Sequence, residues 1–267
     1  MTPGRCCISG VGMRDWDEAS GVGRQALGAQ RPALSARPSS LVSHPAGTEL
    51  LDDSSADDAQ VRESLGNIAR ANRWFGGTWA VQWAMTQLLH ALPAAAPMVL
   101  LDVGAGAGDL AQSAQSVARA RGVDLGVICL DCHRVAARLA LAAGHPALLA
   151  DAGTLPLANR SVDIVLLSQL VHHFDIPSAE HLLREAERVA RRGIIVADLR
   201  PSRLAAALFR PAARAMGFDP ITVHDGVTSL RRAYAAPELA MLMERAGLPS
   251  RVTRRPGWRL VALANLS

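Results

Sequence analysis

Residues 100–110 read LLDVGAGAGDL, an apolar run that leads through three glycines into a stretch with helical spacing. The apolar run predicts a buried strand at 98–103, and the following residues predict a helix at 109–121. Gly104, Gly106 and Gly108 lack Cβ atoms, so the backbone between strand and helix can turn sharply and let a nucleotide-like ligand lie against it. A GxGxxG dinucleotide fingerprint would need glycine or alanine where this chain has Asp109, so on spacing alone the match is weak.

Around this loop, short apolar runs alternate with helical segments, which is typical of a parallel sheet flanked by helices. Further strands are predicted at 125–130, 146–150, 162–168 and 193–198, and helices at 133–143 and 178–191. Near the end of the chain, a predicted helix at 237–247 precedes two predicted strands, 250–255 and 258–264. The turn Pro256-Gly257 joins these two strands, so we expect an antiparallel hairpin at the end of the sheet.

The chain divides by composition into three parts. Residues 1–46 mix Gly, Ser, Pro, Arg and Ala without periodicity and predict a disordered leader. Residues 47–95 predict a helical cover, with one helix that starts near Asp57 and a second over 78–92. Residues 96–267 predict the α/β domain, and a helical, Arg-rich insertion at about 201–235 is expected to form a lid over the sheet edge.

Composition excludes several classes of function. The chain has 267 residues and a formal net charge of +4, it contains no lysine, and only 4% of its residues are aromatic. It therefore lacks the basic stripe with interleaved aromatics that single-strand binders use, and nucleic acid is not expected as a partner. No apolar run approaches the roughly 20 residues of a membrane span. The start lacks the apolar region of a secretory signal, so a cytoplasmic location is expected.

Three acidic residues follow three consecutive predicted strands. Asp102 ends the first strand, Asp131 follows the second and Asp151 follows the third. Ligands in open α/β sheets bind outside the carboxyl ends of the strands, which places all three acids at one edge. Asp131 can accept hydrogen bonds from ribose hydroxyls, and Asp151 can accept one from an exocyclic amine. The alternative is that these acids hydrogen-bond nearby loop N–H groups or cap helices and turns.

Four motifs of this chain resemble the motifs of a known family: LDVGAGAGDL, CLD, LLADAGTLPLANRSVDIV and LLSQLVHHF. Over residues 57–267 the chain resembles the class I S-adenosylmethionine-dependent methyltransferases, in particular the small-molecule group that includes ubiquinone/menaquinone-type enzymes. The resemblance implies an α/β, Rossmann-like, seven-stranded, mostly parallel sheet in the order 3-2-1-4-5-7-6, with the last strand antiparallel. It also implies S-adenosylmethionine as cofactor.

The resemblance assigns donor-binding roles to specific positions. Asp102 and Gly104 would line the methionine moiety, Asp131 the ribose, and Asp151 with Ala152 the adenine. Ser168 and Gln169 would lie beside the sulfonium. The predicted donor site also takes in Ala105, Gly106 and Gly108 of the loop and Cys132 beside the adenosine. No metal ligand is predicted.

Methyl transfer is an in-line displacement, so the protein mainly positions the reactants and supplies a base where the nucleophile carries a proton. Residues just after the fourth strand would face the methyl group, and His172 and His173 stand there. A histidine, with an ordinary pKa near 6.5, suits a phenol or enol hydroxyl. One of the two can instead cap the following helix. His224, next to Asp225 in the lid, is the alternative base.

We therefore expect methyl transfer to oxygen of a hydrophobic small molecule such as a phenol, quinol or polyketide-like compound, with carbon or nitrogen as alternatives, by a monomer or homodimer. One rival is a nicotinamide-dependent Rossmann oxidoreductase. Asp109, the carboxylate after strand three and the absence of a Tyr-x-x-x-Lys pair disfavour it. The other rival is a methyltransferase-like binding protein that has lost turnover.

Residues 129–133, CLDCH, match the CxxCH spacing of c-type haem attachment. A haem would need an exported chain, a helix start free to hold the porphyrin and a second axial ligand, whereas here the motif follows a buried parallel strand. A redox or metal-binding CxxC also lacks its partners. We expect Cys129 to be a small core residue, Cys132 to lie near the adenosine and His133 to open the next helix. The functional residue of this pentapeptide is then Asp131.

Overall fold

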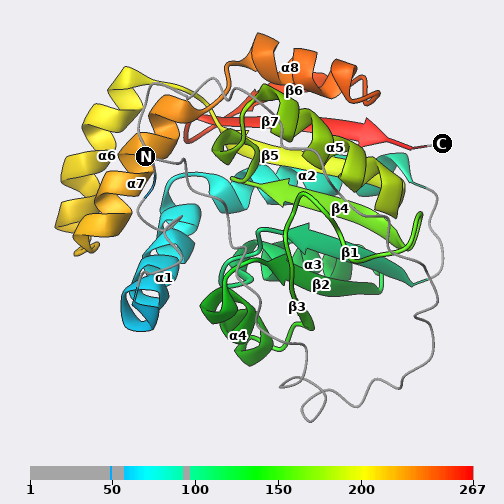
Figure 1. Ribbon diagram of the computed structural model, residues 1–267, viewed down its shortest axis with the longest axis horizontal. Helices are drawn as coiled ribbons and strands as arrows, with labels where there is room; N and C mark the ends of the chain where they lie inside the picture. Colours follow the sequence, from blue (N-terminus) through cyan, green and yellow to red (C-terminus); the bar gives the residue numbers. More distant parts are fainter. Residues whose placement is uncertain (1–48, 50–56, 93–96, 267) are drawn as a thin grey trace, which may run out of the picture.

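The computed structural model describes residues 49, 57–92 and 97–266, and the predicted leader 1–46 lies outside them. Seven strands form one sheet in the order β3-β2-β1-β4-β5-β7-β6 (Figure 1). They are β1 (Met98–Val103), β2 (Leu125–Asp131), β3 (Ala147–Leu149), β4 (Val162–Ser168), β5 (Ala190–Leu199), β6 (Arg251–Arg255) and β7 (Arg259–Asn265). Strands β1 to β5 pair in parallel, and β7 is antiparallel to both β5 and β6. This is the sheet that the sequence predicts.

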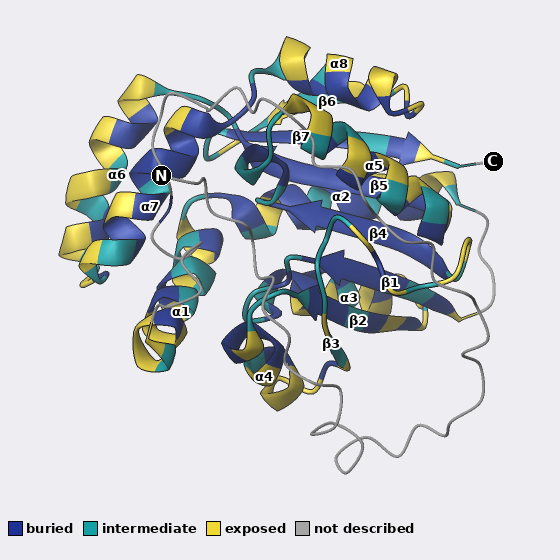
Figure 2. Cartoon of the chain, in the orientation of Figure 1, coloured by how far each residue is buried: buried dark blue, intermediate teal, exposed yellow. Residues whose placement is uncertain are grey.

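Helices cover both faces of the sheet (Figure 2). The buried apolar residues therefore form two main clusters, one on each face of the sheet. On one face lie α5 (Ile176–Val189) and α8 (Ala236–Arg245), which pack on Leu101 and other residues of the strands. On the other lie α2 (Gly77–Ala91) and α3 (Asp109–Ala120), which pack on the neighbouring Leu100. Successive strand residues point to opposite faces, so a strand covered on both sides is mostly apolar. Strand β4 is buried at all seven positions.

The remaining helices are α4 (Arg134–Ala142), α1 (Asp58–Trp74), α6 (Arg203–Ala215) and α7 (Pro220–Arg232). Helices α1, α6 and α7 lie together at one end of the sheet (Figure 1). The rings of Phe75, after α1, and Phe209, in α6, pack edge to face with 5.4 Å between their centroids. Predicted and observed elements agree closely, although β3 is shorter than its predicted run and β5 extends beyond its own. None of the described helices is long and apolar enough to cross a bilayer.

Asp219 ties α7 to α1. Its carboxylate caps α7 by accepting from the N–H groups of Ile221 and Thr222, at 2.9 and 3.0 Å. It also accepts from the side chain of Asn67 at 2.8 Å and from the hydroxyl of Ser64 at 3.1 Å, both on α1. Burial alone would raise the pKa of Asp219, but the hydrogen bonds from Thr222, Asn67 and Ser64 outweigh it and lower the pKa.

Replacing Asp219 by Ala should reduce the free energy of unfolding by about 1–2 kcal/mol, because a helix cap and the bonds to α1 are lost. Since the pKa of Asp219 is lowered by folding, its contribution is present above the ordinary value of 3.8 and is lost as the pH falls through the lowered pKa. Urea unfolding at neutral pH and at a pH below the lowered pKa of Asp219 tests this. The two proteins should converge in acid, and Asp57→Ala, which removes the exposed cap of α1, should cost less.

The hairpin turn presses directly against the end of α1. Gly257 has φ +75°, and an added Cβ there would overlap the carbonyl group of Phe75. Gly122 has a similar φ of +69° but open space around it. Gly122→Ala should cost only the left-handed backbone strain of about 1–2 kcal/mol. Gly257→Ala should cost about 1–3 kcal/mol more through overpacking, measured by thermal unfolding, and equal costs for the two would contradict this account.

Candidate functional site

Two cavities lie at the carboxyl ends of the strands. The glycine-loop cavity, of about 220 Å³, is bounded by the loop after β1, the ends of β2 and β4, and α1. The lid cavity, of about 370 Å³, is bounded by α6, α7, Phe75 after α1, and the turn before β7. Glu49, Ile68, Gln169 and His173 line both cavities. The two cavities therefore meet at these four residues, which we call the junction.

Most of the predicted donor residues line the glycine-loop cavity: Gly104, Ala105, Gly106, Asp131, Cys132, Asp151, Ala152, Ser168 and Gln169. Two do not. Asp102 is buried, with 1% of its surface exposed, and does not line the cavity. Gly108, at φ +78°, caps α3, and a Cβ there would approach the ring of His145 to 3.2 Å. Gly108 therefore serves helix packing and not the cavity wall.

Asp131 holds the glycine loop in place. One carboxylate oxygen accepts from the N–H of Gly106 at 2.9 Å, and the other accepts from the N–H of His133 at 2.8 Å. Gly104 has φ +70°, and a Cβ there would lie 2.9 Å from a methyl carbon of Leu170. The loop is thus fixed by its neighbours, and only glycine fits at 104 without displacing the leucine.

The CLDCH pentapeptide has the structural roles expected from the sequence. Cys129 is buried in β2, and Cys132 lines the glycine-loop cavity. Burial, with the nearby Asp102 and Asp131, raises the pKa of the Cys129 thiol, which makes it an inert core residue. His133 caps α4 by accepting from the N–H of Val135 at 3.2 Å.

Three buried carboxylic acids crowd the glycine loop. Burial raises the pKa of Asp102, Asp109 and Asp131, and for Asp102 the two neighbouring acids add to the rise. Both carboxylate oxygens of Asp102 lack a hydrogen-bond partner among the described residues. A ligand that carries positive charge offsets this concentration of acids, whereas an anion would be repelled. The site is therefore suited to a cationic ligand.

A chain of polar contacts crosses the junction. Arg259 of β7 donates to the side-chain oxygen of Gln169 at 2.6 Å, and Gln169 donates to the side-chain oxygen of Asn72 at 2.5 Å. Asn72, on α1, donates in turn to Asp109 at 3.0 Å. Gln169 adopts φ +52°, which is unusual for a residue with a Cβ. Burial lowers the pKa of Arg259 to about 10, and Asp198 partly offsets this.

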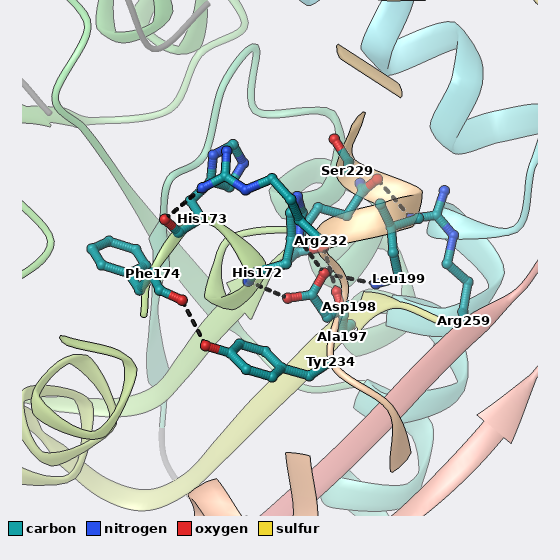
Figure 3. Close-up of polar contacts among 12 residues, drawn as sticks. His172, His173, Phe174, Ala197, Asp198, Leu199, Ser229, Arg232, Tyr234 and Arg259 are labelled. Carbon is teal, nitrogen blue, oxygen red and sulfur yellow. Dashed lines mark hydrogen bonds and ion pairs between the residues drawn. The ribbon is translucent and has the colours of Figure 1, made fainter. Parts of the chain in front are cut away.

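The two predicted histidines have different surroundings. His172 is fully buried, and its Nδ1 donates to Asp198 at 2.6 Å, as Figure 3 shows. Burial would lower the pKa of His172, but the charges of Asp198 and Glu49 and the hydrogen bond to Asp198 raise it to about 10. The ring is thus protonated at neutral pH and cannot take a further proton. The structure favours His172 as a fixed positive group and not as the base.

His173 is the histidine that reaches the reacting region. Its side chain is 24% exposed and lines both cavities. Its Nε2 lies 3.6 Å from Oε2 of Glu49, and its ring centroid lies 4.4 Å from that of His172. Arg232 of α7 donates to the carbonyl oxygen of His173 at 2.9 Å, which fixes the backbone (Figure 3).

His224 lies outside both cavities. Its imidazole is 52% exposed and pairs with the neighbouring Asp225 at 2.9 Å, whereas Asp225 itself lines the lid cavity. On helix α7 the residues that face the cavity are Thr222, Asp225, Gly226, Ser229 and Leu230. His224 does not line that face, so the structure does not bring this predicted alternative base to either cavity.

Sequence reasoning missed Glu49. This carboxylate is 7% exposed, accepts from the hydroxyl of Ser229 at 2.8 Å and lies at the junction. Burial would raise the pKa of Glu49, but His173, His172 and Ser229 lower it to about 2, so it is ionised. Its partner on α7 is 180 residues away in the sequence, and no local motif marks it.

Comparison with known proteins agrees with this geometry. Residues 101–197 match the family model of a methyltransferase domain, and none of the curated proteins compared matches the chain. A SAM-dependent methyltransferase from Aquifex aeolicus has a TM-score of 0.53 at 17% identity, over 79% of this chain and 100% of that one. The plantazolicin methyltransferase in complex with SAH has a TM-score of 0.59 at 12% identity, over 80% and 92%.

Magnesium protoporphyrin IX methyltransferase from Synechocystis PCC 6803 with bound SAH has a TM-score of 0.51 at 15% identity, over 72% of this chain and 84% of that one. At identities this low, the structural similarity establishes the fold alone. The family model that matches residues 101–197 is that of a methyltransferase domain. Residues 101–197 are a methyltransferase domain, and the chain has the fold of the S-adenosylmethionine-dependent methyltransferases. The resemblance stated from the four sequence motifs is thereby confirmed.

Proposed function

We propose that this methyltransferase transfers the methyl group of S-adenosylmethionine to an oxygen atom of a hydrophobic small molecule. The observation that carries the proposal is the junction: a cavity lined by the donor motifs opens, at His173 and Gln169, into a second cavity with apolar walls. Two proteins of similar fold are named as the methyltransferases of plantazolicin and of magnesium protoporphyrin IX. These names support a small molecule as the acceptor.

In the glycine-loop cavity, the donor would lie with its ribose at Asp131, its adenine at Asp151 and Ala152, and its sulfonium near Ser168 and Gln169. Gly104, Ala105, Gly106 and Cys132 complete the wall. Asp102 and Gly108 would act from behind the wall, Asp102 as a buried acid near the loop and Gly108 by its packing. The crowded acids suit the cationic sulfonium better than the neutral thioether product, which favours release of the product.

The lid cavity would hold the acceptor. Leu208 and Phe209 of α6 and Trp258 of the hairpin turn give it aromatic and aliphatic walls, and we assign α6 and α7 as the lid. An apolar pocket with polar groups at one end suits a phenol, quinol or polyketide-like molecule whose hydroxyl faces the junction. Carbon and nitrogen acceptors are the alternatives. The cytoplasmic location and the monomeric or dimeric state expected from the sequence stay predictions.

At the junction, His173 is the proposed catalytic residue. It contacts the hydroxyl of the acceptor and takes up its proton as the oxygen attacks the methyl carbon, which leaves the donor as S-adenosylhomocysteine. Glu49, ionised and 3.6 Å from His173, stabilises the imidazolium that forms. His172 holds the turn through Asp198 and is a positioning residue.

The experiment is methyl transfer from S-adenosylmethionine with a labelled methyl group, first to an extract of the producing organism and then to purified hydrophobic phenols. The proposal predicts a labelled small molecule whose methyl group is bonded to oxygen, identified by mass spectrometry and NMR. Label found only in protein or nucleic acid would contradict it. Donor binding without any transfer would instead favour a binding protein that has lost turnover.

A further inference from the structure

Glu49 and His173 of the junction, together with the neighbouring His172, form a group of potential metal ligands. One ligand atom each of Glu49, His172 and His173 lie within 4.8 Å of one another. The Nε2 atoms of the two histidines lie 3.6 Å from the two different oxygens of the Glu49 carboxylate. Ligand atoms bound at about 2.0–2.2 Å to one ion lie roughly 3–3.5 Å apart, so small side-chain movements would bring all three to a common ion.

His172 has the surroundings of a metal-binding histidine. Its Nδ1 is held by Asp198 at 2.6 Å, and Asp198 also accepts from the N–H groups of His172 and Leu199, at 3.1 and 2.7 Å. The other ring nitrogen, Nε2, is buried and lies 3.6 Å from Oε1 of Glu49, beyond hydrogen-bond distance. It carries a proton in the metal-free protein, and a bound ion would displace that proton. A carboxylate that fixes one nitrogen of an imidazole while the other stays available is the usual outer shell of a histidine ligand.

We propose that Glu49, His172 and His173 bind a divalent transition-metal ion whose remaining coordination positions face the lid cavity. Two imidazoles and one carboxylate suit ions such as Zn²⁺, Mn²⁺ or Fe²⁺ better than Mg²⁺ or Ca²⁺, which prefer oxygen ligands. The charges around the site are mixed. Arg232, 4.0 Å from Glu49, opposes a cation, whereas the carboxylates of Asp198, bonded to His172, and of Asp225, which lines the lid cavity, favour one.

The ion would deepen the proposed function, on which this inference rests, by selecting the acceptor. An aromatic molecule with two adjacent oxygens, such as a catechol or a hydroxyketone, can occupy two open positions at once. The cation would stabilise the oxyanion and so lower the pKa of the bound hydroxyl, whose proton would pass to water in the lid cavity. The oxyanion attacks the methyl carbon, the carbon–sulfur bond breaks with its electron pair left on sulfur, and the ion is neither oxidised nor reduced. With the ion bound, His173 would be a ligand of the ion, and the ion would replace it as the group that activates the hydroxyl.

The test is titration of the chelator-treated, full-length protein with Co²⁺, followed by visible absorption. The proposal predicts one bound Co²⁺ per chain with the spectrum of nitrogen ligation. Glu49→Gln and His173→Asn should each weaken binding at least about tenfold, and Asp198→Asn, which removes the outer carboxylate, by about 10- to 100-fold. The matched control is His90→Gln on α2, an exposed histidine paired with Arg121, which should bind Co²⁺ as the wild type does.

Binding of S-adenosylhomocysteine, measured in parallel, reports whether each variant is folded. Equal Co²⁺ binding by the wild type and by the Glu49→Gln/His173→Asn double variant, with both folded, overturns the inference. Full methyl transfer after chelation, together with no cobalt spectrum, also overturns it while leaving the proposed function intact. A cobalt spectrum that depends on Glu49 and His173 supports the metal site, even where transfer to the tested phenols fails and the proposed acceptor class has to be given up.

Discussion

Replacing Asp131 by Ala is expected to weaken the binding of S-adenosylmethionine by about 100-fold. Two hydrogen bonds from ribose hydroxyls to a carboxylate, at about 1.5 kcal/mol each, would be lost. The carboxylate also holds the N–H groups of Gly106 and His133, so the glycine loop would loosen as well. Isothermal titration of wild type and variant with the donor measures the effect.

The controls for Asp131 lie on either side of it in the CLDCH pentapeptide. Cys132→Ser changes a residue of the same cavity wall, and Cys129→Ser changes a buried residue of β2. Both should largely spare donor binding, although Cys129→Ser places a hydroxyl in the core and should lower stability. Loss of binding in the two serine variants but not in Asp131→Ala would contradict the role given to each residue.

Replacing His173 by Ala is expected to lower kcat by about 100- to 10,000-fold, because the group that contacts the hydroxyl of the acceptor is removed. Donor affinity should change little, since the predicted contacts to adenine and ribose lie elsewhere in the glycine-loop cavity. Steady-state kinetics with a confirmed acceptor, combined with donor titration, separates the two effects.

His224→Ala is the matched control, because it removes a histidine that the sequence favoured as a base and that the structure places outside both cavities. It should keep kcat close to that of the wild type. A large loss of kcat in His224→Ala with none in His173→Ala would reverse the assignment of the base.

The fold was predictable because its signals are local. The apolar run before Gly104 identified the first strand, and the Pro256-Gly257 turn identified the terminal hairpin. Burial on both faces of the sheet removes strand alternation, but length and spacing still separate strands from helices. The position of the acids at one edge of the sheet was predictable for the same reason, since Asp131 ends β2 and Asp151 lies two residues beyond β3.

The junction was predictable only in part. The sequence indicated His172 and His173 together, but which ring is buried depends on how the short turn at 171–173 meets Asp198 of β5. Glu49 and Arg259 reach the junction from distant parts of the chain, through contacts to α7 and to Gln169 that no local pattern records. For His224, the neighbouring Asp225 suggested an activated base, but the helical period turns His224 away from the cavity.

The central claim is that the glycine-loop cavity binds S-adenosylmethionine and not a nicotinamide cofactor. Isothermal titration of the full chain with S-adenosylmethionine, and separately with NADH and NADPH, tests it most directly. The account predicts saturable binding of S-adenosylmethionine at one site per chain and no heat with either nicotinamide. Saturable binding of NADH or NADPH without binding of S-adenosylmethionine would contradict it.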